Sequence, residues 1–183
     1  MIIALTGPKS AGKDYFANFA IRSNPQQMIS KIAFADPIKN DIITIFGLIS
    51  ELEYDEFKRA DITFDINGYT NHIDGRKIVR GYGMMKRSFD PDQFVSYVRA
   101  ETQKFPQAVW IITDLRFQNE LDWLREAKAT IIKIKRDGVY YDGHVSEIDL
   151  VPDSECDFVI TNDGSIADYE RSIKLVWKTL TKK

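Results

Sequence analysis

Cysteine and histidine are scarce in this chain of 183 residues, which has one cysteine and two histidines. The single Cys156 excludes an internal disulfide and any zinc site built from several cysteines. We expect Cys156 to be a small buried apolar side chain, a usage that suits a reducing cytosol. His144 and Glu147 could share one helical face as metal ligands, but only His72 could add a second imidazole. A polar contact to a nucleotide, or a bond within the loop, is therefore the favoured role for this pair.

Long apolar runs and an excess of one charge are also missing. The longest strongly apolar run, 108–112, is far shorter than a membrane-crossing helix, and Met1 leads directly into a strand candidate rather than a signal peptide. A net charge of −2 gives no basic surface for nucleic acid. We therefore expect a cytoplasmic protein whose partner is a small molecule, with no nucleic acid and no membrane. A homodimer stays open.

The stretch 7–14, Gly-Pro-Lys-Ser-Ala-Gly-Lys-Asp, has the spacing of a phosphate-binding loop, G-x-x-x-x-G-K. An apolar strand candidate precedes it and a helix candidate follows it, as this motif requires. The glycines let successive N–H groups point into one concavity at the N-terminal end of the helix, where a phosphate binds. Lys13 would then lie between the β- and γ-phosphates of a nucleoside triphosphate. The alternative is a glycine turn that only caps an ordinary helix.

Two acids are candidate Mg²⁺ ligands. Asp14 stands where a Ser or Thr hydroxyl usually binds the ion, and a carboxylate there can hold it directly or through water. Asp114 ends the buried strand candidate 109–114, which has the form of a Walker B element. Arg116 follows within reach of the same strand end, where ligands collect in open α/β sheets. We predict that the phosphate loop and Asp114 meet at the C-terminal edge of the sheet.

Alternating strand and helix candidates predict an α/β fold with about five short parallel strands and helices on both faces. The length suits one domain, 1–183, with a lid-like insertion at 137–155, a segment without Lys or Arg. Asp36 and Ser165 are the expected helix caps, and Trp110, Trp123 and Trp177 are expected in the core. Further strands are expected at 28–34, 130–134 and 157–160. Helices are expected at 37–46, at 51–59, starting at residue 90, including 121–124, and at 166–180. The segment 61–75 is expected to be a hairpin or a long loop.

Basic residues gather between 76 and 87 around Gly81 and Gly83. Such a cluster is either the solvated face of a helix or a cationic clamp for a phosphate group. A kinase needs cations for a second phosphate group, whereas a nucleotide-dependent switch does not. The Asn-Lys-x-Asp element of guanine-specific switches does not occur, so the kinase is favoured over the switch.

Five segments together resemble the phage-type deoxynucleoside monophosphate kinases. They are Gly-x-x-x-Ala-Gly-Lys-Asp at 7–14, Ala-Asp-Pro-Ile-Lys at 35–39, Thr-Asp-Leu-Arg-Phe-Gln-Asn-Glu at 113–120, His-Val-Ser-Glu at 144–147 and Asp-Phe-Val-Ile-Thr-Asn-Asp-Gly at 157–164. Animal phosphomevalonate kinases are similar in the Gly-Lys-Asp loop, a Pro-x-Lys and an Asp-x-Arg. The segments 144–147 and 159–164 favour the deoxynucleotide family.

The resemblance implies a P-loop kinase fold and transfer of the γ-phosphate of ATP, with Mg²⁺, to a deoxynucleoside 5′-monophosphate, in a host cytoplasm if a phage encodes the protein. The implied ATP site comprises Gly7, Ser10, Ala11, Gly12, Lys13, Asp14, Tyr15, Arg136 and Asn162. The implied acceptor site comprises Lys9, Ile38, Lys39, Arg76, Arg80, Gly83, Phe94, Asp114, Arg116 and Glu120. The implied catalytic groups are Lys13, Asp114, Arg116, Arg76 and Arg87, and the implied metal ligands are Asp14 and Asp114.

The acceptor phosphate is mostly dianionic at neutral pH, so it can attack the γ-phosphorus without a general base. Catalysis then consists of positioning and charge neutralisation. Tyr82 or Phe94 offers a flat surface on which the base can stack. The family commonly has Gln-x-x-Gly-Thr in mid-chain, whereas residues 80–84 here are Arg-Gly-Tyr-Gly-Met, and base preference stays open.

Overall fold

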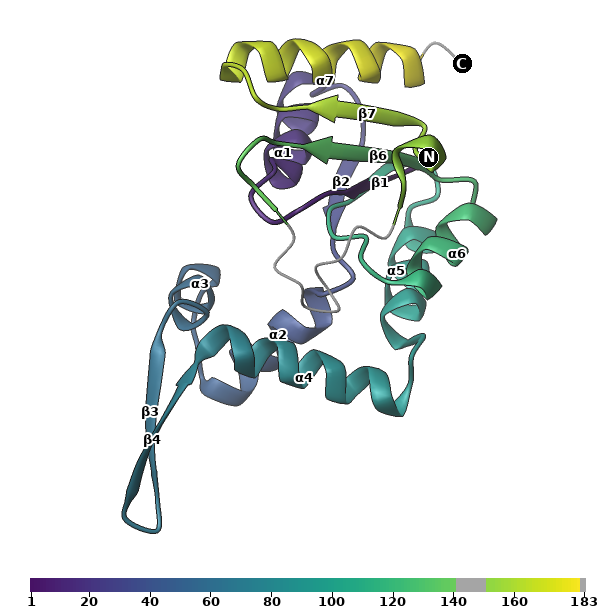
Figure 1. Cartoon of the computed structure of the whole chain (residues 1–183). Coiled ribbons are helices and arrows are strands. Elements are labelled where there is room, and N and C mark those ends of the chain that lie inside the picture. Colours follow the sequence, from purple (N-terminus) through teal and green to yellow (C-terminus); the bar gives the residue numbers. More distant parts are fainter. Residues whose placement is uncertain (141–150, 182–183) are drawn as a thin grey trace. The chain divides into compact units, whose positions relative to one another are not determined.

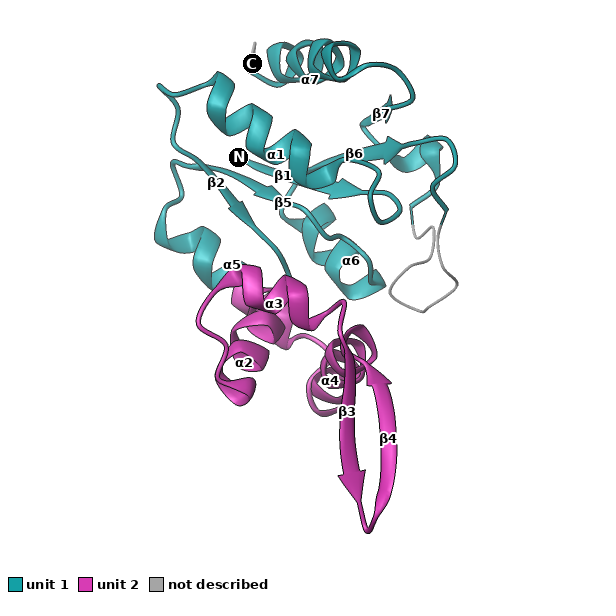
Figure 2. Cartoon of the chain, turned by 90° about the vertical axis from the view of Figure 1, so that its left-hand side faces the viewer, with its two compact units in different colours: residues 1–34, 98–183 teal, residues 35–97 magenta. Residues whose placement is uncertain are grey.

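The computed structural model describes residues 1–140 and 151–181. The chain forms two compact units, which Figure 2 draws in different colours: unit 1 comprises residues 1–34 and 98–183, and unit 2 comprises residues 35–97. Each is described by itself below, and the single-domain boundary 1–183 stays a prediction. Most of the expected lid, including His144 and Glu147, lies outside the described residues.

Unit 1 contains a parallel sheet of five strands in the order β2-β5-β1-β6-β7. The strands are β1 (Ile2–Thr6), β2 (Ile29–Ile32), β5 (Val109–Ile112), β6 (Thr130–Lys135) and β7 (Phe158–Thr161). They are rich in β-branched residues, as strands that are buried on both faces usually are. β1 lies at the centre, where Ala4 pairs with Ile112 on one side and with Ile131 on the other. The predicted five-stranded parallel sheet is confirmed.

Helices cover both faces of this sheet (Figure 2). On one face, α1 (Lys13–Ser23) and α7 (Ile166–Leu180) pack against alternate residues of β1 and β6. The buried cluster includes Ile3, Leu5, Ile132, Ile134, Phe16, Ala20, Tyr169, Ile173 and Trp177. The other face carries α6 (Gln118–Glu126) and the C-terminal part of α5 (Gln93–Lys104). The core thus fixes the start of α1, and with it the loop 7–12 between β1 and α1.

Unit 2 contains α2 (Asp36–Phe46), α3 (Glu51–Phe57), a hairpin of β3 (Asp61–Ile66) and β4 (Tyr69–Asp74), and α4 (Gly75–Phe89). Figure 1 shows the hairpin as a long two-stranded arm between α3 and α4. Asn67 and Gly68 make its turn with φ angles of 52° and 80°. Two positive φ angles are what a two-residue hairpin turn with the right twist needs, so the hairpin alternative for 61–75 is confirmed.

Several local predictions were wrong. α2 begins at Asp36, with Ala35 at the N-cap position, so Asp36 lies inside the first turn and does not cap it. Cys156 is half-exposed rather than buried. The helix expected from residue 90 begins only at Gln93. The buried positions of Trp110, Trp123 and Trp177 and the cap by Ser165, whose Oγ accepts from the Asp168 amide, are confirmed. No helix in the described residues has the length and apolarity needed to cross a membrane.

Candidate active site

The loop between β1 and α1 has the backbone geometry of a phosphate-binding loop. Three of its residues have positive φ angles: 132° at Gly7, 65° at Ser10 and 113° at Gly12. A Cβ atom at Gly7 would lie 2.1 Å from the carbonyl oxygen of Ile134 on the neighbouring strand. Glycine is therefore required at position 7 both by conformation and by space. Ser10 and Ala11 complete the turn, and Lys9 is exposed beside it.

Lys13 directs its amino group into this loop. Its Nζ donates hydrogen bonds to the carbonyl oxygens of Gly7 at 2.6 Å and Pro8 at 2.7 Å, and the side chain is buried. A buried ammonium group needs several acceptors, which the loop carbonyls supply here. The positive charge therefore lies within the loop, where the phosphates of a nucleotide would bind.

Residues from the end of β7 and from α7 donate hydrogen bonds to backbone carbonyls of the loop. The Asn162 side-chain amide donates to the Ala11 carbonyl at 2.9 Å, and the Tyr169 hydroxyl donates to the Gly12 carbonyl at 3.0 Å. Asn162 was expected at the loop, but Tyr169 was expected only as part of the apolar face of α7. A buried tyrosine where leucine or phenylalanine would suffice for packing is the signal that could have revealed it.

Two other predicted nucleotide-site residues lie next to this loop. Arg136 approaches the Ser10 carbonyl, with an Nη1 to O distance of 3.5 Å. The Tyr15 hydroxyl donates to Glu170 at 2.6 Å, and this hydrogen bond, with burial, raises the pKa of Tyr15 above its ordinary value. The hydroxyl of Tyr15 thus faces α7, whereas the guanidinium of Arg136 faces the loop.

The two predicted metal ligands lie at the same edge of the sheet. Asp114 follows β5, next to β1 in strand order, and its Oδ1 accepts from the Phe34 amide at 2.7 Å. Asp14 lies in the first turn of α1, is 75% exposed, and is 3.4 Å from the amino group of Lys31. Within the described residues no group of three or more His, Cys, Asp or Glu side chains could hold a metal ion. Two carboxylates suit Mg²⁺, which keeps several waters and takes its other ligands from phosphate.

Arg116 and Glu120 occupy the turn between β5 and α6. Glu120 is fully buried, and its Oε2 accepts from the amides of Arg116 at 2.9 Å and Phe117 at 3.1 Å. These bonds fix the backbone that carries the half-exposed Arg116. Glu120 therefore has a structural function in this turn, and its contact with substrate stays a prediction.

In unit 2 the predicted basic residues lie on one face of α4. Arg76, Arg80, Gly83 and Arg87 follow one another at intervals of four, three and four residues, which places them on a common helical face. The same face meets α2, because a Cβ atom at Gly83 would lie 2.8 Å from Cδ1 of Ile38. Gly83 therefore allows close contact between the two helices, and the arginines flank that contact.

Further contacts within unit 2 order other predicted acceptor residues. Lys39 pairs with Glu51 at 2.5 Å. The Arg87 guanidinium lies over the Phe94 ring at 4.5 Å, and Phe94 is 0% exposed. A buried ring offers no open face to a base, so the structure does not support the expected stacking on Phe94. Tyr82, half-exposed with its hydroxyl 3.0 Å from Asp41, is the better candidate.

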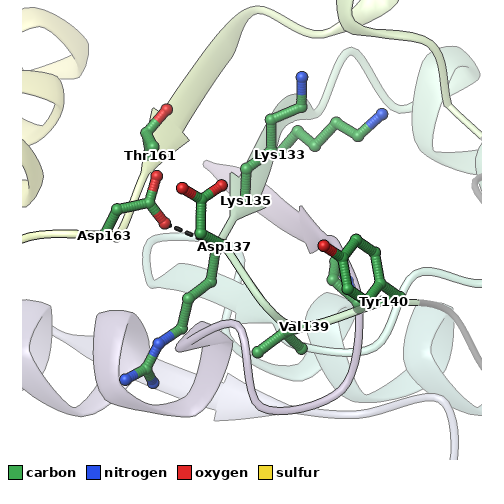
Figure 3. A pocket seen from close by; sticks show the side chains of 9 residues that line it. Lys133, Lys135, Asp137, Val139, Tyr140, Thr161 and Asp163 are labelled. Carbon is green, nitrogen blue, oxygen red and sulfur yellow. Dashed lines mark hydrogen bonds between the residues drawn. The ribbon is translucent and has the colours of Figure 1, made fainter.

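A basic cavity of about 420 Å³ lies beside Pro8 of the loop (Figure 3). Its lining comes from the carboxyl ends of β6 and β7 and comprises Pro8, Lys133, Lys135, Arg136, Asp137, Val139, Tyr140, Thr161 and Asp163. Lys133 is 2% exposed, and its amino group donates to the Val151 carbonyl at 2.8 Å and pairs with Asp153 at 3.0 Å. Sequence analysis missed this cavity except for Arg136, although two lysines at alternate positions of an apolar strand were a visible signal.

Comparisons with known proteins indicate the family of this chain. The family model for deoxynucleotide monophosphate kinase matches residues 50–173. A mimivirus protein (Acanthamoeba polyphaga mimivirus), provisionally named a deoxynucleotide monophosphate kinase, is 31% identical over 186 residues, covering 94% of each chain. The deoxynucleotide monophosphate kinase of Enterobacteria phage T4 is 31% identical over 125 residues, covering 65% of this chain and 52% of the phage protein.

Among solved structures, dephospho-CoA kinase from Campylobacter jejuni matches with a TM-score of 0.55 and 17% identity, covering 99% of this chain and 97% of that one. At this identity the match shows the fold alone, which is that of a P-loop kinase. The sequence relatives carry the finer assignment and favour the deoxynucleotide family over the phosphomevalonate kinases. This chain belongs to the deoxynucleotide monophosphate kinase family.

Proposed function

We propose that this enzyme transfers the γ-phosphate of ATP to a deoxynucleoside 5′-monophosphate, with Mg²⁺ bound to the phosphates of the donor. The family accounts for the acceptor class, nucleoside monophosphates. The observation that carries the choice of a triphosphate donor is the loop 7–12, in which the amino group of Lys13 already lies within hydrogen-bond distance of two loop carbonyls.

In this proposal the donor phosphates bind to the amides of the loop and the start of α1. The partial positive charge of the helix N-terminus and the ammonium of Lys13 then stabilise the charge that builds up on the transferred group. Arg116 follows β5 and Arg136 follows β6, the two strands that flank β1, and both are proposed as further cations for the phosphates. Ser10, Tyr15 and Asn162 shape the loop.

Asp14 and Asp114 would hold Mg²⁺ through carboxylate oxygens or through bound water. When bound, the ion neutralises charge on the β- and γ-phosphates. Asp14 is exposed enough to reach a hydrated ion, and its pairing with Lys31 is a surface contact of modest strength. Asp114 keeps one oxygen on the Phe34 amide, which fixes the carboxylate at the end of β5.

The acceptor phosphate would bind to the basic face of α4 in unit 2. Arg76 and Arg80 carry permanent positive charges, and each guanidinium can bind a phosphate dianion through bidentate hydrogen bonds. Arg87 is oriented by the ring of Phe94, and Lys39 by Glu51. The dianion needs no general base, so these groups orient and neutralise it. The contact of Lys9 with the acceptor stays a prediction.

The test is to offer ATP and Mg²⁺ with each of several acceptors and to follow ADP release. The acceptors are the four common deoxynucleoside monophosphates, their ribose counterparts, modified pyrimidine deoxynucleotides and phosphomevalonate. We expect a deoxynucleoside monophosphate to be preferred. Turnover of phosphomevalonate alone would contradict the proposal, and ATP binding without transfer to any acceptor would favour a nucleotide-dependent switch.

A further inference from the structure

Two side chains from the C-terminal part of unit 1 hold adjacent carbonyl groups of the phosphate-binding loop. We propose that Tyr169 and Asn162 are positioning residues for donor binding, because they fix the peptide groups whose N–H bonds face the phosphates. This inference rests on the proposed role of the loop as the ATP site. According to this inference the start of α7 contributes to nucleotide affinity, although it lies more than 150 positions along the chain from the loop.

The argument follows from the geometry of the peptide bond. In a trans peptide the C=O and the next N–H point in opposite directions, and the described chain contains no cis peptide. Asn162 holds the Ala11 carbonyl, which directs the Gly12 N–H to the other side of the loop. Tyr169 and the Phe16 amide, at 3.0 Å and 2.9 Å, together hold the Gly12 carbonyl, which does the same for the Lys13 N–H. Both donors are thereby oriented before any ligand arrives.

The two side chains also lie directly against Gly12. A Cβ atom there would be 2.7 Å from the Asn162 amide nitrogen and 3.2 Å from the Tyr169 hydroxyl. The φ angle of 113° at Gly12 is one that glycine adopts readily and other residues rarely do, so position 12 needs glycine. The hydrogen bonds to the Ala11 and Gly12 carbonyls hold the two peptide groups that flank this residue in one orientation.

The position of Tyr169 is itself well fixed. Ser165 caps α7 and exchanges hydrogen bonds with Asp168, which sets the first turn of the helix. The Tyr169 ring packs 5.9 Å from the ring of Tyr15, and the residue is 4% exposed. Burial raises the pKa of Tyr169 above its ordinary value, so the hydroxyl keeps its proton and acts as a donor throughout the physiological pH range.

Pre-oriented donors improve binding because the ligand does not have to order them. The Tyr169→Phe variant keeps the ring and removes only the hydroxyl. One neutral hydrogen bond corresponds to about a two- to tenfold change in an equilibrium constant. We expect Tyr169→Phe to weaken binding of ATP by that factor and to weaken inorganic tripolyphosphate equally, since the loop contacts phosphates rather than the base. The KM for the acceptor nucleotide should not change.

The experiment measures dissociation constants of the full-length chain for ATP and for tripolyphosphate by calorimetry, together with thermal unfolding. Tyr54→Phe is the matched control, because Tyr54 is also a buried tyrosine but belongs to α3 of unit 2. It should leave both dissociation constants unchanged. Asn162→Ala, at a half-exposed position, is the second variant and should weaken both ligands by a similar factor even if Tyr169→Phe folds poorly.

The outcomes separate the inference from the proposed function. Equal losses for ATP and tripolyphosphate in either variant support the inference. If the unsubstituted chain binds both ligands and the folded variants bind them equally well, the positioning inference alone is wrong, and a lower unfolding temperature would then reflect packing only. If the unsubstituted chain binds neither ligand, the donor site itself is wrong and the inference fails with it.

Discussion

Two glycines of α4, two positions apart, allow a test of how unit 2 is packed. Alanine in a helix interior is more stable than glycine by about 0.5–1 kcal/mol, because glycine loses more backbone freedom on folding. A Cβ atom at Gly81 meets nothing within 4 Å, whereas one at Gly83 lies 2.8 Å from Cδ1 and 3.8 Å from Cγ1 of Ile38. The helix contribution is the same in both variants, so the difference between them isolates the contact with α2.

We expect Gly81→Ala to stabilise the protein by about 0.5–1 kcal/mol. Gly83→Ala gains the same helix contribution but forces Cδ1, the far end of the Ile38 side chain, to move, and an off-rotamer side chain costs about 0.5–1.5 kcal/mol. The two variants should therefore differ by about 0.5–1.5 kcal/mol, and each kcal/mol corresponds to about 2–4 °C in Tm in a chain of this size. Urea and thermal unfolding of both variants measure this difference.

A third substitution makes the test specific to one atom. Ile38→Val removes Cδ1, after which the nearest Ile38 atom still present would lie 3.8 Å from the new Cβ, an ordinary contact distance. In the Ile38→Val background, Gly83→Ala should lose its penalty and stabilise about as much as Gly81→Ala, a coupling that a double-mutant cycle measures. Equal stabilisation by Gly81→Ala and Gly83→Ala in the original background would refute the described packing of α2 against α4.

Three further predictions concern charge. Lys13→Ala should lower turnover by orders of magnitude with little change in unfolding temperature, because the ammonium supplies charge rather than apolar packing; near-normal steady-state turnover would contradict this. Asp14→Asn should raise the Mg²⁺ concentration needed for half-maximal activity, since an amide is a poorer ligand for a hard cation; an unchanged Mg²⁺ dependence would leave only a helix-terminal role. The hydrogen bond from Lys86, at 2.5 Å, lowers the pKa of Asp41 below 3.8, so its contribution to stability is present above that value and is lost as the pH falls further. Urea unfolding between pH 2 and 6 should accordingly show a weaker acid dependence in Asp41→Asn, and an identical dependence would exclude this pair.

Local signals in the sequence predicted much of this structure. The spacing of Gly7, Gly12 and Lys13 after an apolar run predicted the loop, and Asn67-Gly68 between alternating residues indicated the hairpin. These succeed because loop and turn conformations depend on residues that are close in the sequence. Asp114 could be placed at the edge of the sheet from strand polarity alone, since parallel strands end on the same side.

What the sequence could not provide are contacts between distant residues. The bond from Tyr169 to Gly12 joins positions far apart in the chain. A tyrosine on the apolar face of α7 indicates that its hydroxyl needs a partner, but the sequence near α7 does not show that the partner is the loop. The burial of Phe94 beneath Arg87 likewise depends on how α4 and α5 meet, which sequence spacing does not specify. The cap predicted at Asp36 was wrong because a proline can stand at either the first or the second position of a helix. Pro37 stands at the second, so the helix begins one residue earlier than predicted.

The most direct test of the central claim is to follow the γ-phosphate itself. ATP labelled in that phosphate should be incubated with the enzyme, Mg²⁺ and a deoxynucleoside monophosphate, and the products separated. The proposed function predicts that the label appears in the deoxynucleoside diphosphate, only when the acceptor is present, and that Lys13→Ala abolishes its appearance. Label released as inorganic phosphate at the same rate with and without an acceptor would contradict it.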